Sequence, residues 1–294
     1  MIKQILKLQK NFLKIKMKKI LVLGSNGSLG NKICFELKKN KYRVFNQTRS
    51  KKNKYFCDFK KENRFNLLLK KYKPDLIINT ISNINVDECE KNFQKCYFDN
   101  IITSEIISRI SAKFKIKQIY ISTDQVYSGK GPHKELNTKP LNNYGISKIC
   151  AENFVLKNKG VVLRVNFLQK DKKRRTLQDK IIYSKNKSFI LFKNIYFTPL
   201  HISTLVDIIT KNLFKFKTGI YNIGSKNKIS KANFILKLLK ILNIKKNLVI
   251  KKYSNQIIPR PLDMTMNSNK IKKDLKVKFY DINPEIMKLA NDYI

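Results

Sequence analysis

The chain has 294 residues, of which 42% are hydrophobic, so it can bury a full core in one large α/β domain or in a nucleotide-binding domain with a smaller partner. Its 63 Lys and Arg residues against 20 Asp and Glu residues give a formal net charge of +43. Arginine is scarce beside lysine, and the lysines are scattered along the chain. The composition therefore argues against a nucleic-acid-binding surface and favours a general attraction for anionic ligands.

The cysteine and histidine content argues against a disulfide framework and against a metal centre. The cysteines are odd in number and have no CxxC or Cys/His ligand spacing, and the only histidines are His133 and His201. These features predict a reducing, cytoplasmic location. No apolar run approaches the length needed to span a membrane. The five cysteines are Cys34, Cys57, Cys89, Cys96 and Cys150.

Residues 1–16 form a basic segment that would be amphipathic as a helix, which raises the alternative of a membrane-surface anchor. The segment lacks the small-residue cleavage site of a secretory signal and the Arg and Ser bias of a transit peptide. Met17, followed by two lysines and an apolar run, resembles a natural beginning. We therefore expect residues 1–16 to be an upstream extension that is either not translated or disordered.

Strands alternate with helices over the first 165 residues. Such alternation predicts βαβ units and an α/β fold with a Rossmann-type, doubly wound parallel sheet. In chain order the patterns predict a strand at 19–24, a helix at 28–39, strands at 42–45 and 75–79 around a helix at 62–72, a long helical region at 87–114, a strand at 118–122, a helix within 141–157 and a strand at 160–165.

The remainder of the chain is less regular and shows no internal repeat or low-complexity linker. We expect it to form a smaller lobe that is interleaved with the sheet. Its patterns predict helices near 176–184, 202–214, 231–242 and 284–293, and strands near 189–192 and 219–223.

A GxxGxxG turn follows the first predicted strand and opens the first predicted helix. Glycines here permit a tight turn, close approach of the backbone to a pyrophosphate, and helix–strand packing. The helix N-terminus offers free N–H groups and a positive dipole end to the phosphates. The turn therefore predicts a dinucleotide site, with contacts from Gly24, Asn26, Gly27, Ser28, Leu29 and Gly30.

The end of the second predicted strand indicates which dinucleotide binds. An acidic residue there would bind the ribose 2′-hydroxyl of NAD, whereas a nearby arginine accommodates the 2′-phosphate of NADP. The sequence RVFNQTRS has no carboxylate, and it places Arg49 close to the strand end. We expect NADPH as the cofactor, with NADH as the alternative.

Tyr144 and Lys148 form a YxxxK pair, and Thr123 ends the strand that precedes it. On a helix the two side chains project from one face. A nearby ammonium lowers the pKa of a phenol, so Tyr144 is expected to exchange a proton near neutrality. The Thr123 hydroxyl can hydrogen-bond a substrate oxygen. Alone the pair could be a surface helical pair, but together with the glycine turn it predicts a catalytic set.

These motifs resemble the extended short-chain dehydrogenases/reductases and, within them, the dTDP-4-dehydrorhamnose reductase family. The resemblance runs from Met17 almost to the C-terminus. It implies an NAD(P)-binding Rossmann domain at 17–165 and a mainly substrate-binding lobe at 166–294. It is carried by GSNGSLG, PDLIINTISNINVDECE, YISTDQVYSGKGPHKELNTKPLNNYGISKICAE, VVLRVNF, FTPLHISTLVDII, GIYNIGS and IPRPLDMTMNSNKI.

The resemblance implies hydride transfer to the C4 ketone of a nucleotide-activated deoxy-sugar used in surface polysaccharide synthesis. Tyr144 would protonate the C4 oxygen, Lys148 would hold the nicotinamide ribose, Thr123 would bind the reacting oxygen, and Asn100 would support the proton relay. The implied cofactor contacts also include Asp58 at the adenine and Asn79, Thr80 and Ile81. The implied substrate contacts are Thr123, Asp124, Gln125, Tyr144, Asn166, Phe167 and Arg260.

The chain departs from the reductase pattern at Gln125, Ser128 and Phe167, where the family tends to have an aromatic residue, Asp and Trp. These are pocket positions, so the sugar and the nucleotide stay open. The alternatives are a nucleotide-sugar epimerase or dehydratase, which Asp124 beside Thr123 keeps open, and a non-catalytic regulatory subunit. We expect a nucleotide-sugar substrate, no nucleic acid, no membrane span and no metal-binding residue, with a homodimer possible.

Overall fold

The central feature of the computed structural model is a sheet of six parallel strands in the order β10-β5-β4-β3-β1-β2, which confirms the predicted doubly wound α/β fold. The structure describes residues 17–50, 52–59, 61–171, 176–185, 187–254 and 258–294, so the expected extension at 1–16 lies outside the described residues. The strands are β1 (Lys19–Leu23), β2 (Arg43–Gln47), β3 (Leu76–Asn79), β4 (Lys117–Thr123), β5 (Val161–Val165) and β10 (Gly219–Ile223).

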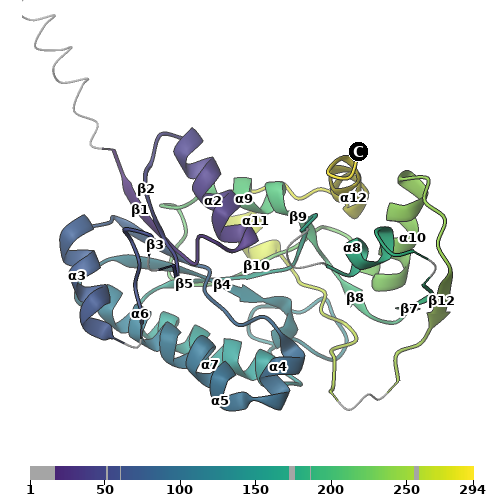
Figure 1. Ribbon diagram of the computed structural model, residues 1–294, viewed down its shortest axis with the longest axis horizontal. Coiled ribbons are helices and arrows are strands. Elements are labelled where there is room, and N and C mark those ends of the chain that lie inside the picture. The colour runs from purple at the N-terminus through teal and green to yellow at the C-terminus, as the bar shows by residue number, and fades with distance from the viewer. Residues whose placement is uncertain (1–16, 51, 60, 172–175, 186, 255–257) are drawn as a thin grey trace, which may run out of the picture.

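Helices cover both faces of the sheet (Figure 1). On one face, Leu29, Ile33 and Leu37 repeat every four residues and pack with Leu205 and Ile209 against the strands. None of the described helices is both long enough and apolar enough to cross a bilayer. The first face carries α2 (Ser28–Lys39), α9 (Ile202–Lys211) and α11 (Asn269–Leu275), and the other carries α3 (Glu62–Tyr72), α6 (Thr103–Lys113) and α7 (Asn143–Lys157).

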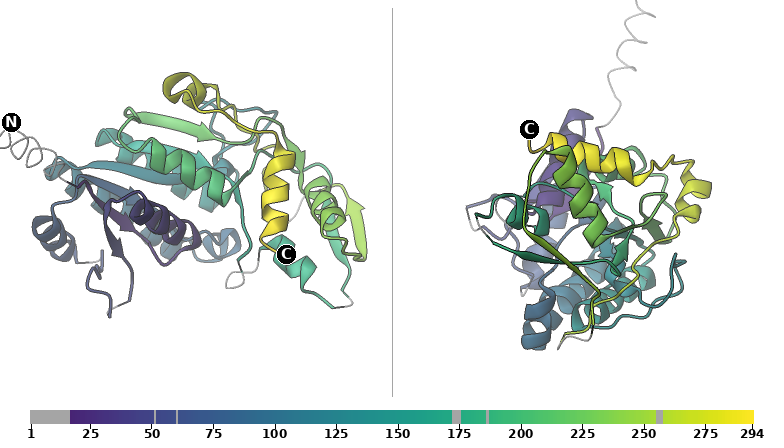
Figure 2. Two further views of the ribbon diagram at one scale, coloured as in Figure 1. Left: turned by 90° about the horizontal axis from the view of Figure 1, so that it is seen from above. Right: turned by 90° about the vertical axis from the view of Figure 1, so that its right-hand side faces the viewer.

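A smaller lobe lies beyond the carboxyl ends of the strands and has a core of its own (Figure 2). Its two-residue strands were not predicted, because two residues show no periodicity; β12 and α11 were also missed. The lobe contains α8 (Leu177–Ile182), α10 (Lys231–Ile241) and α12 (Ile282–Asn291). Its paired strands are β6 (Phe167–Leu168) with β9 (Leu200–His201), β7 (Phe189–Phe192) with β12 (Leu248–Lys251), and β8 (Tyr196–Phe197) with β11 (Ile229–Ser230).

The long helical region predicted at 87–114 is helical, but it is not one helix, because the chain breaks at Asn92. The Asn92 backbone is not helical, and its side chain accepts a hydrogen bond from the Lys95 N–H at 3.0 Å, which caps a new helix. Sequence periodicity does not register such a cap inside an apolar repeat. The segments observed are α4 (Val86–Lys91), α5 (Phe93–Cys96), a π-helical turn (Tyr97–Ile102) and α6.

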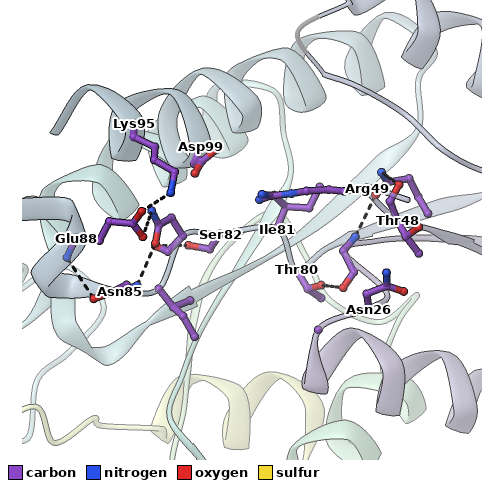
Figure 3. A pocket seen from close by; sticks show the side chains of 15 residues that line it. Asn26, Thr48, Arg49, Thr80, Ile81, Ser82, Asn85, Glu88, Lys95 and Asp99 are labelled. Atoms are coloured by element: carbon purple, nitrogen blue, oxygen red, sulfur yellow. Dashed lines mark hydrogen bonds and ion pairs between the residues drawn. The ribbon is translucent and has the colours of Figure 1, made fainter. Parts of the chain in front are cut away.

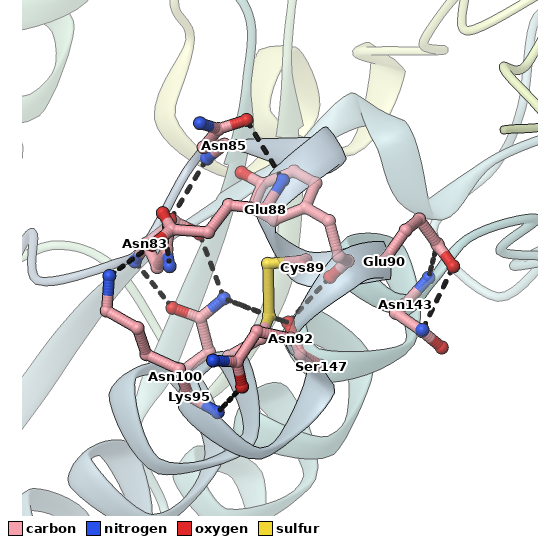
Figure 4. The surroundings of a disulfide bond; sticks show 12 residues. Asn83, Asn85, Glu88, Cys89, Glu90, Asn92, Lys95, Asn100, Asn143 and Ser147 are labelled. Atoms are coloured by element: carbon pink, nitrogen blue, oxygen red, sulfur yellow. Dashed lines mark hydrogen bonds and ion pairs between the residues drawn. A yellow bond between two sulfur atoms is a disulfide. The ribbon is translucent and has the colours of Figure 1, made fainter.

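The same break corrects the expectation that the cysteines are unpaired. Cys89 and Cys96 form a disulfide with their Cα atoms 5.0 Å apart (Figure 4). Seven residues of a continuous α-helix would separate the Cα atoms by about 10.5 Å, too far for a disulfide. The break at Asn92 brings them together, whereas Cys34, Cys57 and Cys150 are free.

A buried ion pair joins the sheet to α7. Arg164 on β5 and Glu152 on α7 are 2% and 1% exposed, and their closest atoms are 2.5 Å apart. Arg164 also donates to the Tyr127 hydroxyl at 2.7 Å and to the Glu135 carbonyl at 2.5 Å. Ser122 at the end of β4 donates to Glu152. The pair therefore fixes the helix that carries Tyr144 and Lys148 against the strand ends.

We expect Glu152→Gln to lower the free energy of unfolding by about 3–5 kcal/mol, because it leaves the Arg164 guanidinium buried without its counter-ion. Urea unfolding without cofactor measures this. The control is Glu105→Gln, whose partner Arg109 is 50% exposed, and we expect a loss of about 1 kcal/mol or less. Equal losses in the two variants would contradict the role of the buried pair.

Candidate active site

The chain reverses its direction of winding between β1 and β3, and ligands of open α/β sheets bind at such a point. The glycine turn follows β1, and Gly24 has a φ of +80°, which favours glycine. A Cβ atom on Gly24 would lie 2.8 Å from the Thr80 Oγ1, and one on Gly30 would lie 2.5 Å from the Gly24 carbonyl oxygen. The turn therefore packs too closely for side chains at these positions.

A cavity of about 500 Å³ opens at this point (Figure 3). Asn26, Thr48 and Arg49 lie at one end of it, and Glu88 and Lys95 form an ion pair at the other. Its walls are Gly24, Asn26, Gly27, Gln47, Thr48, Arg49, Thr80, Ile81, Ser82, Asn83, Ile84, Asn85, Glu88, Lys95 and Asp99.

A second cavity of about 300 Å³ shares Arg49, Ile81 and Asp99 with the first. Asp58, which resemblance assigns to the adenine, lines this second cavity. The two cavities therefore adjoin each other, with the glycine turn at the first and a largely apolar wall at the second. The remaining lining residues are Phe56, Cys57, Phe59, Phe98 and Thr103.

Some of the predicted cofactor residues line the two cavities, and the others pack behind them. Gly24, Asn26, Gly27, Arg49, Asp58, Thr80 and Ile81 line the cavities. The other predicted residues line neither cavity. Leu29 is in the core, Gly30 packs on Gly24, and Asn79 is buried with its Oδ1 accepting from the Ile81 N–H at 3.0 Å. Ser28 donates to Asp171 of the smaller lobe.

Three predicted catalytic residues gather beside the first cavity. Lys148 is 1% exposed and donates to the Ile121 carbonyl at 2.9 Å and to the Ser82 hydroxyl at 3.4 Å. Tyr144 is 6% exposed and interacts with both Ser82 and Thr123. Ser82 lines the cavity, so it connects the cavity to the tyrosine and the lysine.

Asn100 is fully buried in the π-helical turn and does not contact Tyr144 or Lys148 directly. Its Oδ1 accepts from the Asn83 N–H at 2.7 Å and from the Ser82 hydroxyl at 3.0 Å. Its Nδ2 donates to the Ser147 Oγ at 2.9 Å. Figure 4 shows this amide beside the Cys89–Cys96 disulfide, where it joins the loop after β3 to α7. Asn100 therefore holds Ser82, which in turn contacts the catalytic pair.

The pKa values correct one expectation. Burial raises the pKa of Tyr144 to about 12, although its hydrogen bonds to Thr123 and Ser82 act to lower it. Burial also lowers the pKa of Lys148 to about 7, against a smaller opposing effect of Glu152. Lys148 is not among the groups that shift the Tyr144 pKa, so the predicted lowering by this lysine is wrong. The lysine ammonium instead bonds to the Ile121 carbonyl and lies 4.2 Å from the centre of the Tyr120 ring.

Predicted substrate residues continue from Thr123 toward the smaller lobe. Asp124 is 1% exposed and accepts from the Thr123 hydroxyl at 3.2 Å and from the Asn166 amide at 2.5 Å. Burial raises the pKa of Asp124 to about 6. The Gln125 Oε1 is buried and has no hydrogen-bond partner among the described residues.

Phe167 and Arg260 lie farther from the catalytic set. Phe167 packs against the core that β5 and α9 share, so its ring is only partly available to a ligand. Arg260, assigned by resemblance to the nucleotide end of the substrate, forms an ion pair with Asp87 of α4 at 2.5 Å. Its side chain is 31% exposed, so the guanidinium lies at the surface.

Sequence reasoning missed four residues with direct access to this region. Ser82 and Asn83 follow β3 within the segment that the resemblance already included, so extending that assignment by two residues would have found them. Gln47 ends β2 and accepts from the Gly24 N–H at 3.2 Å, but only a carboxylate was sought there. Lys231 gave no signal in a chain with so many lysines. Across the described ranges, no three His, Cys, Asp or Glu side chains gather as metal ligands do.

Comparison with known proteins agrees with this geometry. The RmlD substrate binding domain family matches residues 17–294. The Bacillus subtilis spore coat polysaccharide biosynthesis protein SpsK is 26% identical over 71% of this chain and 74% of its own length. The Xenopus laevis methionine adenosyltransferase 2 subunit beta is 24% identical over 87% of this chain and 82% of its own.

Solved structures show the same fold. A Bacillus anthracis dTDP-4-dehydrorhamnose reductase in complex with NADP superposes with a TM-score of 0.85 at 21% identity, covering 94% of this chain and 99% of its own. Fold, glycine turn and YxxxK pair define an extended short-chain dehydrogenase/reductase, a class of NAD(P)-dependent oxidoreductases. Within that class, the chain belongs to the RmlD substrate binding domain family.

The lowered pKa of Lys148 predicts a pH-dependent stability. Between about pH 7 and 10.5 the folded protein binds fewer protons at this lysine than the unfolded chain does, so its contribution to the free energy of unfolding rises with pH. From pH 7 to pH 9 we expect a rise of about 2 kcal/mol from this residue, at 1.36 kcal/mol per pKa unit. Urea unfolding of the cofactor-free protein measures it.

Lys148→Met should lose this part of the rise. Lys157→Met, which removes an exposed lysine from the same helix, should keep it and controls for the general effect of a reduced net charge. The same pH dependence in all three proteins would contradict a buried ammonium at Lys148.

Proposed function

We propose that the protein uses NADPH to reduce the C4 ketone of a nucleotide-activated deoxy-sugar, as a dTDP-4-dehydrorhamnose reductase does, in the synthesis of surface polysaccharide or O-antigen sugars. The observation that carries the proposal is the convergence of Thr123, Tyr144 and Lys148 beside the cavity at the switch point of the sheet. Relatives named as a spore coat polysaccharide biosynthesis protein and as dTDP-4-dehydrorhamnose reductases support the substrate class.

The residues present fit a dinucleotide. The turn opens α2 and so presents a helix N-terminus to a pyrophosphate, and Asn26 and Gly27 line the adjoining cavity. Arg49 lies where the two cavities meet, so its guanidinium would bind the 2′-phosphate. Asp58 would contact the adenine, and Lys148 the nicotinamide ribose. Bound NADPH supplies the hydride for C4.

The proton for the C4 oxygen would come from Tyr144. Its raised pKa keeps the phenol protonated at neutral pH, so it can donate as negative charge develops on the oxygen. Thr123 would donate a second hydrogen bond to the same oxygen and hold the ketone in line with the tyrosine. Lys148 would stabilise the phenolate that remains, and Ser82 and Asn100 would hold the lysine in position through their hydrogen bonds.

Two alternatives make different use of this site. An epimerase or dehydratase would need Asp124 as an acid or base, but both Asp124 oxygens accept hydrogen bonds from Thr123 and Asn166. A non-catalytic regulatory subunit would need no catalytic set, and the Xenopus relative is named as a subunit beta of methionine adenosyltransferase 2. The intact Thr123, Tyr144 and Lys148 set favours a reductase over both.

Tyr144→Phe tests the proposed reaction. We expect wild-type protein to oxidise NADPH in the presence of an enzymatically generated dTDP-4-keto-6-deoxy-sugar, followed at the nicotinamide absorbance. Loss of the proton donor should reduce kcat by about 10²–10⁴-fold while NADPH binding is retained. No oxidation by wild-type protein that binds NADPH would refute the dTDP-sugar reductase and shift support to an epimerase or a regulatory subunit.

Arg49→Met tests the choice of cofactor. Removal of the guanidinium should weaken NADPH binding by about 10- to 100-fold, the effect of losing a charge-assisted hydrogen bond, and leave NADH binding unchanged. Direct titration of each dinucleotide measures both affinities. The control is Arg64→Met, an exposed arginine on α3 that lines neither cavity. A parallel loss for NADH and NADPH would contradict a contact between Arg49 and the 2′-phosphate.

A further inference from the structure

Lys231 is the first residue of α10, and contacts within the smaller lobe fix its position. Its N–H donates to the Ile195 carbonyl at 2.8 Å, and Ser230 caps the helix by accepting from the Asn233 N–H at 3.1 Å. The Lys231 ammonium lies 3.7 Å from the centre of the Phe197 ring. The aromatic face and the helix start therefore hold the side chain in one direction.

That direction brings the ammonium toward the catalytic strand end. Its charge acts on Asp124, the residue after Thr123, and lowers the pKa of that carboxyl against the larger effect of burial. Asp124 reciprocates by raising the pKa of Lys231, which burial lowers. Lys231 is thus a side chain of the smaller lobe whose charge interacts with Asp124, and Asp124 also accepts a hydrogen bond from Asn166.

The ammonium lacks a full counter-ion. No acidic side chain of the described ranges lies within 4.0 Å of it, and both Asp124 oxygens already accept other hydrogen bonds. A partly desolvated ammonium is costly unless an anion or strong acceptors complete its surroundings. An uncharged deoxy-sugar offers only hydroxyl groups, whereas the diphosphate that carries the sugar offers negative charge.

We propose that Lys231 binds the diphosphate of the nucleotide-sugar substrate and so places the sugar between the smaller lobe and Thr123. This inference rests on the proposed function, because it takes the substrate class from it. With the ketone at Thr123 and Tyr144, the sugar extends past Asp124 and Asn166, and the diphosphate at its other end meets the ammonium. The contact gives the smaller lobe a direct part in recognising nucleoside diphosphates.

The test is the binding of dTDP, UDP and dTDP-glucose to the full chain, measured by calorimetry with NADPH present. Lys231→Met should weaken nucleoside diphosphate binding by about 10- to 100-fold, the effect of losing a charge-assisted hydrogen bond. Lys231→Arg should retain most of the affinity. Lys240→Met removes an exposed lysine from the far end of the same helix and should change nothing. Unchanged NADPH affinity shows that each variant is folded.

The pattern of losses decides between outcomes. If Lys231→Met lowers the affinities for dTDP and dTDP-glucose by equal factors, the result supports the contact with the diphosphate. A loss confined to dTDP-glucose would overturn it in favour of a contact with the sugar, and unchanged affinities in Lys231→Met would overturn it outright. Wild-type protein that binds NADPH but no nucleoside diphosphate would instead refute the proposed function, and this inference with it.

Discussion

The buried ion pair between Arg164 and Glu152 is the constraint on which the geometry of the site depends. A buried pair of opposite charges is stable only where its remaining donors and acceptors are hydrogen-bonded. Here Ser122 donates to Glu152, and Arg164 donates to Tyr127 and to a backbone carbonyl. The network fixes α7 relative to the ends of β4 and β5. The side chains that α7 presents at its N-terminal end then meet the strand end at Thr123 without a rearrangement.

A second, smaller network fixes the opposite wall of the site. Asn100 uses both ends of its amide between the loop after β3 and α7, so a displacement of Ser82 breaks one of the two hydrogen bonds to its buried Oδ1. The break at Asn92 and the adjoining disulfide hold the π-helical turn that carries Asn100. π-helical turns are frequent at functional sites. In this protein the π-helical turn directs the Asn100 side chain into the interior.

The sequence predicted regular features well and irregular ones poorly. The glycine turn and the helices starting at Ser28 and Glu62 follow from local spacing, so their bounds agree with the structure. The break at Asn92 and the contact between Ser28 and Asp171 depend on residues brought together by folding, which spacing does not encode. Spacing also does not encode which of the predicted cofactor residues line the cavities and which pack behind them. Residue type indicates what a side chain can bind, but burial decides whether it faces the ligand.

In the proposed reduction, the pKa values of Tyr144 and Lys148 favour proton donation by the tyrosine. A phenol whose pKa is raised to about 12 keeps its proton at neutral pH, and a reductase needs that proton at the moment hydride arrives. Lys148, with a pKa near 7, is only partly charged until a neighbouring negative charge favours its protonated form. The phenolate left by proton donation is such a charge. In the proposed reaction, burial retains the proton on Tyr144 until it is donated, and the negative charge of the resulting phenolate then favours the charged form of Lys148 against the effect of burial.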